Sequence, residues 1–127
     1  MEDKVADKLK VLTQSRAITT EVIDECLRQV DKWGIQNHPS LDCTLRNREG
    51  GCTPLRMAQQ YEVPSETRAR QLLDNAARKG ELTWAHILME EVAEAIGTEN
   101  IEDLRAELIQ AIAVGVSWVA SIDRNNQ

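Results

Sequence analysis

The chain has 127 residues, with 21 acidic and 15 basic side chains and a formal net charge of −6. This length suits one domain with a real core, and an acidic balance without clustered Lys and Arg excludes a nucleic-acid-binding surface. The three cysteines follow neither disulfide-framework nor CxxC spacing and suit a reducing cytoplasm. The start is polar, and the longest uncharged stretch, residues 108–122, is too short for a membrane span. We therefore expect a cytoplasmic protein without a membrane partner.

The composition favours helices. There is no Phe, one Tyr and three Trp, so the core must be built mainly from Leu, Ile, Val and Ala. These residues suit packed helices better than a β-sandwich. We expect an all-α fold, with a four-helix-bundle-like core over residues 18–124 and a short N-terminal helix over residues 1–17. Together they would form one domain, residues 1–127.

The first part of the chain predicts two helices separated by a polar break. Three apolar side chains recur with the spacing of one helix face: Val5, Leu9 and Leu12. The polar residues 13–16 would end this helix. Thr19 or Thr20 can then cap a second helix, which Gly34 ends. Its apolar face consists of Ile23, Cys26, Leu27, Val30 and Trp33.

The middle of the chain combines a long loop with two short helices. Periodicity disappears over residues 34–53, and ordered loops of that length are more often functional than merely connecting. Thr53 followed by Pro54 predicts the start of one short helix. Ser65 predicts the start of another, which stops at Gly80.

Two further helices are predicted in the last third of the chain. Thr83 would cap a helix over residues 84–96, and Gly97, which tolerates a positive φ, would terminate it. Asn100 would cap a helix over residues 101–122. That helix carries no charge from residue 108 onward, a pattern typical of a helix enclosed by others.

Carboxylates lie beside the apolar stripes of both these helices. Glu91 and Glu94 are three residues apart and can face one object, and Glu107 and Gln110 repeat that spacing on the second helix. Alternatively, these glutamates form an ordinary acidic helix face that is exposed to solvent. A carboxylate beside an apolar stripe is nevertheless costly to desolvate unless a cation compensates it. Packed antiparallel, the helices would offer three carboxylates and an amide oxygen to Mg²⁺ or Mn²⁺.

Two segments of the sequence resemble the motifs of one protein family. Glu90-Glu91-Val92-Ala93-Glu94, followed by Glu107-Leu108-Ile109-Gln110, resembles the EExxE and ExxD signature of the MazG-like all-α nucleoside triphosphate pyrophosphohydrolases. Lys32-Trp33-Gly34-Ile35-Gln36-Asn37-His38-Pro39 resembles the KWGxQNHP stretch of the same family. The resemblance covers roughly residues 18–124. One position departs from the signature, because Gln110 stands where the family has Asp.

The resemblance implies metal-dependent hydrolysis of a nucleoside or deoxynucleoside triphosphate to the monophosphate and pyrophosphate. Mg²⁺, or Mn²⁺, would be held by four residues: Glu91, Glu94, Glu107 and Gln110. Glu90 and Glu91 would be catalytic, with Glu90 orienting or deprotonating the attacking water. Five residues would bind the substrate: Lys32, Trp33, Gln36, Asn37 and His38. The resemblance also implies a homodimer or homotetramer.

Several alternatives stay open at this point. Trp33 can also be a core aromatic at the end of an apolar stripe, and His38 an exposed loop residue. His38, Cys43 and Cys52 could in principle converge on zinc, although their spacing is irregular. Because Gln110 removes a negative charge from the site, the chain is alternatively a catalytically impaired MazG-fold protein, serving as a nucleotide-binding or interaction module.

Overall fold

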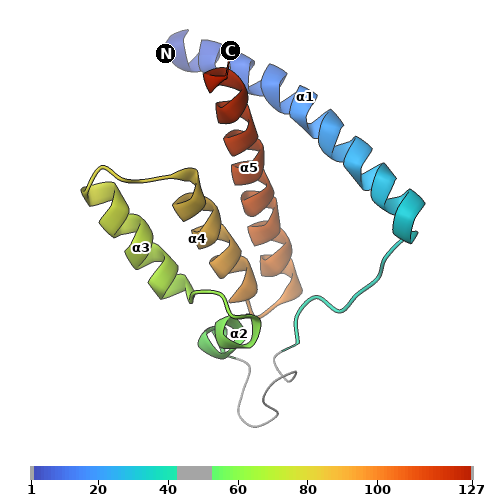
Figure 1. The fold of residues 1–127 in the computed structure, drawn as a ribbon, viewed down its shortest axis with the longest axis vertical. Helices are drawn as coiled ribbons and strands as arrows, with labels where there is room; N and C mark the ends of the chain where they lie inside the picture. The colour runs from blue at the N-terminus through green and yellow to red at the C-terminus, as the bar shows by residue number, and fades with distance from the viewer. Residues whose placement is uncertain (1, 43–52, 127) are drawn as a thin grey trace. The chain divides into compact units, whose positions relative to one another are not determined.

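Helices make up almost all of the described chain. A computed structural model describes residues 2–42 and 53–126. Along them run α1 (Glu2–Trp33), α2 (Pro54–Tyr61), α3 (Glu66–Arg78), α4 (Trp84–Ile96) and α5 (Ile101–Asn125) (Figure 1). No strand occurs among these described residues. The predicted all-α fold is therefore confirmed, while the MazG-type bundle stays a prediction.

The chain divides into two compact units, and each is described by itself. The first comprises residues 1–38 and 116–127, and the second comprises residues 39–115. Helix α5 begins in the second unit and ends in the first. In the first unit, the guanidinium of Arg124 near the end of α5 donates a hydrogen bond to Gln14 of α1 at 2.9 Å.

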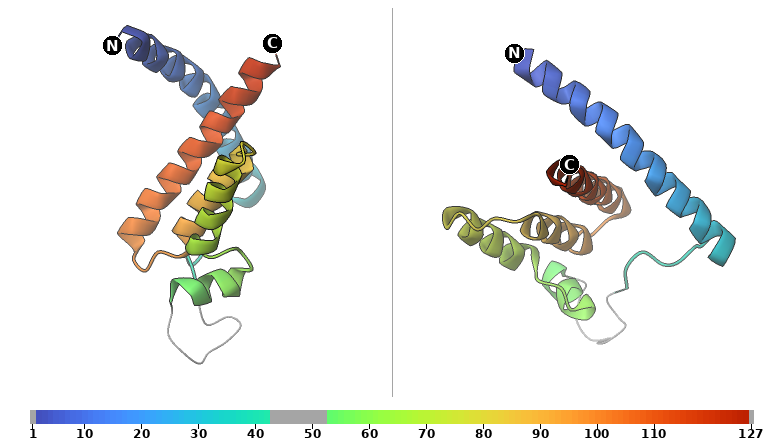
Figure 2. Two further views of the ribbon diagram at one scale, coloured as in Figure 1. Left: turned by 90° about the vertical axis from the view of Figure 1, so that its left-hand side faces the viewer. Right: turned by 45° about the horizontal axis from the view of Figure 1, so that its top comes forward.

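The second unit is built on a helical hairpin. Helices α3 and α4 lie side by side, joined by residues 79–83, and α2 packs against α4 (Figures 1 and 2). The buried side chains of this unit are mostly small: Met57, Ala58, Ala69, Ala76, Ala93 and Ala95. Small side chains let helix backbones approach closely, so the hairpin fixes the directions in which the polar side chains of α4 point.

The starts of the helices agree with the predicted caps. Thr53, Ser65 and Thr83 each accept a hydrogen bond from the backbone N–H three residues further on, at 3.2, 3.2 and 3.4 Å. Asn100 accepts one from the N–H of Asp103 at 2.8 Å. These bonds satisfy donors that a helix N-terminus leaves unpaired, which explains why the elements begin at these residues.

Two of the three predicted glycine terminators, Gly80 and Gly97, behave differently. At Gly80 φ is +70°, and the N–H of Glu81 reaches the carbonyl of Ala76 at 2.8 Å, as in a Schellman motif. The prediction of a positive φ at Gly97 is wrong, because its φ is −84°. A Cβ on Gly97 would lie 3.4 Å from the Cβ of Pro54. The missing side chain therefore serves the close approach of α2 to the end of α4.

The predicted break in the first helix is also wrong. α1 runs without interruption from Glu2 to Trp33. The hydroxyls of Thr13 and Thr20 donate to the carbonyls of Leu9 and Arg16 at 3.0 and 2.9 Å, one turn earlier. Bonded in this way, the threonines are accommodated within a continuous helix instead of capping a new one.

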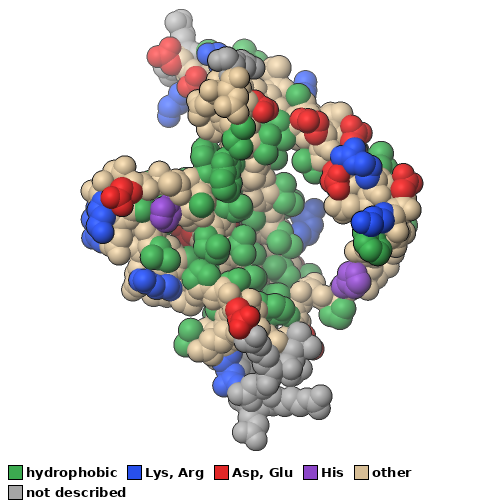
Figure 3. All heavy atoms as spheres, in the orientation of Figure 1, with side chains coloured by type: hydrophobic (Ala, Val, Ile, Leu, Met, Phe, Trp, Pro, Cys, Tyr) green, Lys and Arg blue, Asp and Glu red, His purple; other side chains and the backbone are tan. Residues whose placement is uncertain are grey.

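Within the unit to which each of its parts belongs, helix α5 is not enclosed, contrary to expectation. Its one buried residue is Ala120, and several large apolar residues are exposed: Leu108, Ile109, Ile112, Val119 and Ile122. Figure 3 shows apolar side chains uncovered along the course of α5. Among the described residues, α5 is the one helix long and apolar enough to cross a membrane, a test that core helices of water-soluble proteins also pass.

The alanine packing of the hairpin generates a prediction about stability. Replacing Ala93, which is 3% exposed, by Leu should lower the free energy of unfolding by about 1–3 kcal/mol, because the larger side chain forces α4 away from its neighbours. Chemical denaturation followed by circular dichroism measures this change. The matched control is Ala113→Leu at an exposed position of α5, which should change stability by less than about 0.5 kcal/mol. Equal effects of the two substitutions would contradict the packing described.

Candidate metal centre

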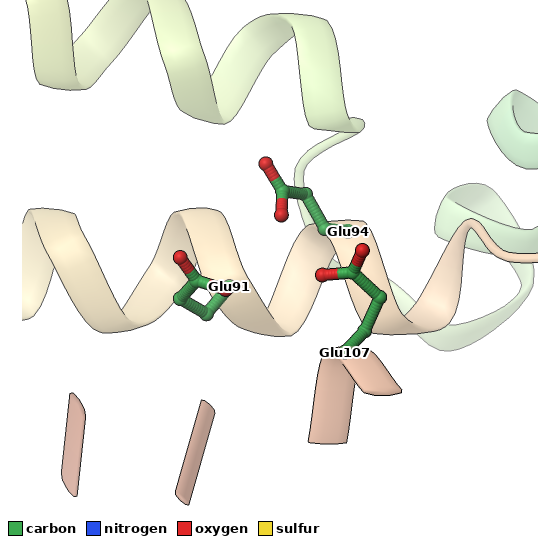
Figure 4. A group of neighbouring side chains, drawn as sticks. All are labelled: Glu91, Glu94 and Glu107. Atoms are coloured by element: carbon green, nitrogen blue, oxygen red, sulfur yellow. The ribbon is translucent and has the colours of Figure 1, made fainter. Parts of the chain in front are cut away.

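Three glutamates from two helices meet in the second unit. Glu91 and Glu94 come from α4 and Glu107 from the first part of α5. Each offers one carboxylate oxygen, and these oxygens all lie within 4.8 Å of one another (Figure 4). All three side chains are half-buried. The structure thus brings together three of the four residues predicted as metal ligands.

Two oxygens of this cluster are buried without a partner. They are the Oε2 atoms of Glu91 and Glu107, which accept no hydrogen bond from any described residue. A buried carboxylate oxygen that has lost water and gained no donor is costly. A cation placed between the carboxylates would remove this cost. This observation distinguishes the cluster from an ordinary solvated acidic face.

Arg70 of α3 contacts the outer edge of the cluster. Its Nη2 atom lies 3.1 Å from Oε1 of Glu94 and 3.0 Å from Oε1 of Glu66, and its Nε atom lies 3.7 Å from Oε1 of Glu90. One guanidinium therefore serves three carboxylates on two helices, and these contacts raise the pKa of Arg70. Arg70 joins α3 to the acidic face of α4.

The surroundings of three carboxylates, those of Glu90, Glu91 and Glu107, raise their pKa values. Burial, followed by the nearby carboxylates of Glu94 and Glu90, raises the pKa of Glu91 above its usual range. Burial and then Glu94 likewise raise the pKa of Glu90, against the opposing charge of Arg70, and the pKa of Glu107. Both causes disfavour the ionised form. A divalent cation would favour ionisation of the same groups, because its charge outweighs their mutual repulsion.

The donor set fits a hard divalent cation. Carboxylate oxygens are preferred by Mg²⁺ and Mn²⁺, whereas zinc favours nitrogen and sulfur ligands. Oxygens on opposite sides of a bound Mg²⁺ lie about 4.2 Å apart. Adjacent ligands lie about 3.0 Å apart, and three ligands include at least two adjacent pairs, so Glu91, Glu94 and Glu107 would need to draw together to share one ion.

Two predicted residues lie outside the three-carboxylate group. The Glu90 carboxylate lies near Arg70, and Glu90 remains a candidate to act on a water at the edge of the cluster. Gln110 lies one turn beyond Glu107 and is exposed, so its part in metal binding stays a prediction.

The predicted substrate residues all belong to the first unit and are exposed. The Lys32 Nζ atom lies 4.9 Å from the centre of the Trp33 ring, a cation–π contact. Three of the predicted residues also line one open depression of about 510 Å³, together with residues from the preceding turns of α1: Lys32, Trp33, Gln36, Glu25, Arg28 and Gln29. Trp33 is 62% exposed, so no residue of its own unit covers it, and the alternative of a core aromatic stays untested.

The structure describes the first part of the predicted loop. Residues 34–42 contain no helix, as predicted, and the backbone N–H of Asp42 donates to the hydroxyl of Tyr61 at 2.8 Å. Cys43 and Cys52 lie outside the described residues. The alternative of a zinc site with His38 therefore stays untested.

Sequence reasoning missed two contributors to the site. Arg70 was not singled out from the sequence, and the one local signal was Glu66, one turn earlier and able to pair with it. The contact with Glu94 spans 24 positions of sequence and depends on how α3 packs against α4. His86 was not singled out, yet it completes a capping box in which its Nδ1 accepts from the N–H of Thr83 at 3.1 Å.

Comparisons of this chain with protein-family models, with curated proteins and with solved structures found no significant match. The site is therefore argued from its geometry, and the family resemblance remains an expectation from the motifs.

The raised pKa values predict how stability depends on pH without metal. In the unfolded chain these glutamates return to an ordinary pKa of 4.5, so above that pH the folded state binds more protons than the unfolded one. The free energy of unfolding contributed by these groups therefore falls as pH rises from 4.5 through the raised values. Comparing wild type with Glu91→Gln isolates the effect, because the variant lacks one such group.

Thermal unfolding in a chelating buffer, from pH 4.5 to 7.5, measures this difference. Relative to Glu91→Gln, the wild-type protein should lose stability as pH rises, and Mn²⁺ should restore it at the upper end. Parallel pH profiles for the two proteins would show that Glu91 does not carry the raised pKa.

Proposed function

We propose that the protein is a divalent-metal-dependent hydrolase that converts a nucleoside or deoxynucleoside triphosphate to the monophosphate and pyrophosphate. The observation that carries this proposal is the meeting of Glu91, Glu94 and Glu107, with two buried carboxylate oxygens left without a hydrogen-bond donor. The motif resemblance supplies the reaction type. Homo-oligomerisation and a cytoplasmic location are part of the same proposal.

The carboxylates would hold Mg²⁺ or Mn²⁺, with Gln110 offering a neutral amide oxygen where the family has a carboxylate. The ion, when bound, would neutralise the phosphate chain and lower the pKa of a coordinated water. Glu91, Glu94 and Glu107 would fix its position, and the first two lie on α4, which packs closely against α3. Their partial burial keeps them poorly hydrated and so available to a cation.

Glu90 and Arg70 would act next to these ligands. Glu90 is a candidate to accept a proton from the attacking water, and its raised pKa brings it closer to neutral pH than a solvated Glu. Arg70, whose side chain is half exposed, would be free to turn from Glu94 toward a phosphate oxygen once a divalent ion compensates the carboxylates.

We assign substrate recognition to the exposed end of α1 and the residues after it. An uncovered indole such as that of Trp33 can stack on a base, and the ammonium of Lys32 is a donor for phosphate. Gln36 and Asn37 offer amide groups to the base or sugar, and His38 a ring nitrogen. All of these groups are exposed and therefore accessible to a ligand.

Metal binding and pyrophosphate release together test the proposed function. Calorimetry with Mg²⁺ or Mn²⁺, with and without a nonhydrolysable nucleotide, should show binding to the wild-type protein. Glu91→Gln should weaken that binding at least tenfold and abolish release of pyrophosphate across the common ribo- and deoxyribonucleoside triphosphates, because it removes one ligand charge at nearly constant shape. The matched control is Glu102→Gln on the exposed start of α5. Turnover that survives Glu91→Gln would reject the site, and a wild-type protein that neither binds metal nor releases pyrophosphate would reject the enzyme.

A second function, nucleotide binding without hydrolysis, is favoured by the ion pair between Arg70 and Glu94. A guanidinium that already compensates the cluster competes with a metal ion, and the neutral Gln110 lowers the attraction for that ion further. The protein would then serve as a nucleotide-binding or interaction module.

Substituting Gln110 by Asp separates the two functions. The added carboxylate should strengthen Mn²⁺ binding several-fold, because it restores one negative charge near Glu107. If the wild-type protein is an impaired module, pyrophosphate release should appear only in Gln110→Asp. If it is a working enzyme, release should be present before the substitution. An unchanged metal affinity in Gln110→Asp would show that position 110 lies outside the centre.

A further inference from the structure

The guanidinium of Arg70 lies between the carboxylates of the second unit and the surrounding water. Its Nη2 atom donates to Oε1 of Glu66 at 3.0 Å and to Oε1 of Glu94 at 3.1 Å, and its Nε atom lies 3.7 Å from Oε1 of Glu90. The side chain of Arg70 is half exposed, whereas those of Glu90 and Glu94 are mostly covered. Arg70 therefore covers the outer side of the cluster.

The contacts of Arg70 with α3 and with α4 can break separately. Glu66 lies four residues before Arg70 on the same helix, so this pair needs only α3 itself. Glu90 and Glu94 lie on α4, and Glu94 is also one of the proposed metal ligands. Exposed side chains change rotamer rapidly. The guanidinium can thus leave Glu94 while Glu66 still holds it at the same surface.

Arg70 and a divalent ion would compete for the charge of Glu94. A carboxylate that already accepts a charge-assisted hydrogen bond attracts a second cation less strongly, because the two cations repel each other. An ion that binds alone therefore has to weaken the pairs of Arg70 with Glu94 and Glu90. This cost lowers the affinity for the free ion.

A phosphate chain that arrives with the ion would remove this cost. Phosphate oxygens accept bidentate hydrogen bonds from a guanidinium, as carboxylates do. The Oε2 atoms of Glu91 and Glu107 are buried, so a ligand has to approach from the exposed side, where Arg70 lies. Arg70 would then exchange a carboxylate for a phosphate without losing an anionic partner.

We propose that Arg70 makes the binding of the divalent ion and of the phosphate chain mutually dependent. It opposes the free ion by pairing with Glu94 and Glu90, and it favours the ion together with its phosphate chain by transferring to a phosphate oxygen. This inference rests on the proposed function, because it takes a phosphate-bearing ligand at the same centre. Arg70 thereby selects the metal–triphosphate complex over the free metal ion.

Binding measurements on the full chain test this dependence. Calorimetry follows Mn²⁺ alone and then, in excess Mn²⁺, whichever α,β-imido deoxynucleoside triphosphate the wild-type protein binds most tightly. Arg70→Gln should bind Mn²⁺ alone more tightly, by about fivefold or more, because the competing charge is gone. It should bind the analogue in Mn²⁺ more weakly, by about fivefold or more, because a phosphate loses its guanidinium.

The matched control is Arg68→Gln, which makes the same change of charge on α3. Arg68 is exposed and points about 160° away from Arg70 around the helix. Its replacement should alter either affinity by less than about twofold, because salt screens a charge on the far side of the helix.

Opposite changes in the two affinities distinguish this role from a structural one. A side chain that merely holds α3 against α4 would weaken both affinities when replaced. That result, or any other pattern than opposite changes in Arg70→Gln, would overturn the inference. Opposite changes without release of pyrophosphate by the wild-type protein would support the inference and reject hydrolysis alone. Mn²⁺ binding to neither protein would reject the metal centre and this inference with it.

Nuclear magnetic resonance follows the exchange in the wild-type protein, so this test does not depend on the folding of a variant without Arg70. The Nε–H signal of Arg70 is identified by its absence in Arg70→Lys. Saturating Mg²⁺ alone should speed its exchange with water, because the guanidinium loses carboxylate partners. Adding the same analogue should slow that exchange again, because a phosphate takes their place. An Nε–H signal that responds to neither addition would overturn the inference.

Discussion

Repulsion among closely placed carboxylates is the constraint on which the second unit depends. Glu91 and Glu94 on α4 lie close to Glu107 on α5, and partial burial weakens the screening that water would otherwise provide. Arg70 of α3 offsets part of this repulsion at one edge, and the pKa values of Glu91 and Glu107 are raised. Arg70 reaches Glu94 but leaves the inner oxygens of Glu91 and Glu107 without a donor. The compensation is therefore partial, which is why the cluster is suited to a cation.

The small uncharged residues between the helices of the second unit determine where the charged side chains of α3 and α4 lie. α3 and α4 pack through alanines, and Gly97 allows Pro54 to approach the end of α4. With so little side-chain volume between the helices, the polar groups on their flanks are held at short distances. The first unit shows the opposite case, because α1 carries large apolar residues that no neighbour within that unit covers. Small buried residues bring α3 and α4 together, whereas the large apolar residues of α1 are exposed within their unit.

Much of this could be predicted from sequence where the cause is local. Thr53, Ser65, Thr83 and Asn100 cap the helices that their side chains suggested, and the three-residue spacing of Glu91 and Glu94 placed both on the side of α4 that meets Glu107. The predictions that proved wrong concern features that depend on distant residues or on competing local hydrogen bonds. The threonines of α1 bond backward and permit a continuous helix, and the role of Gly97 depends on a residue 43 positions earlier. The reach of Arg70 to Glu94 likewise required knowing how two helices pack.

The α3–α4 hairpin is held by two kinds of attraction that respond differently to the surrounding medium. The side chain of Arg70 is 52% exposed, whereas those of Glu90 and Glu94 are 19% and 17% exposed. Dissolved ions can therefore reach the guanidinium from outside and loosen its pairing at moderate ionic strength. The alanine contact beneath it is apolar and is strengthened, not weakened, by salting-out ions. Salt can thus release Arg70 from its carboxylate partners while α3 and α4 remain packed together. The charge around the glutamates therefore changes with ionic strength, whereas the helix packing does not.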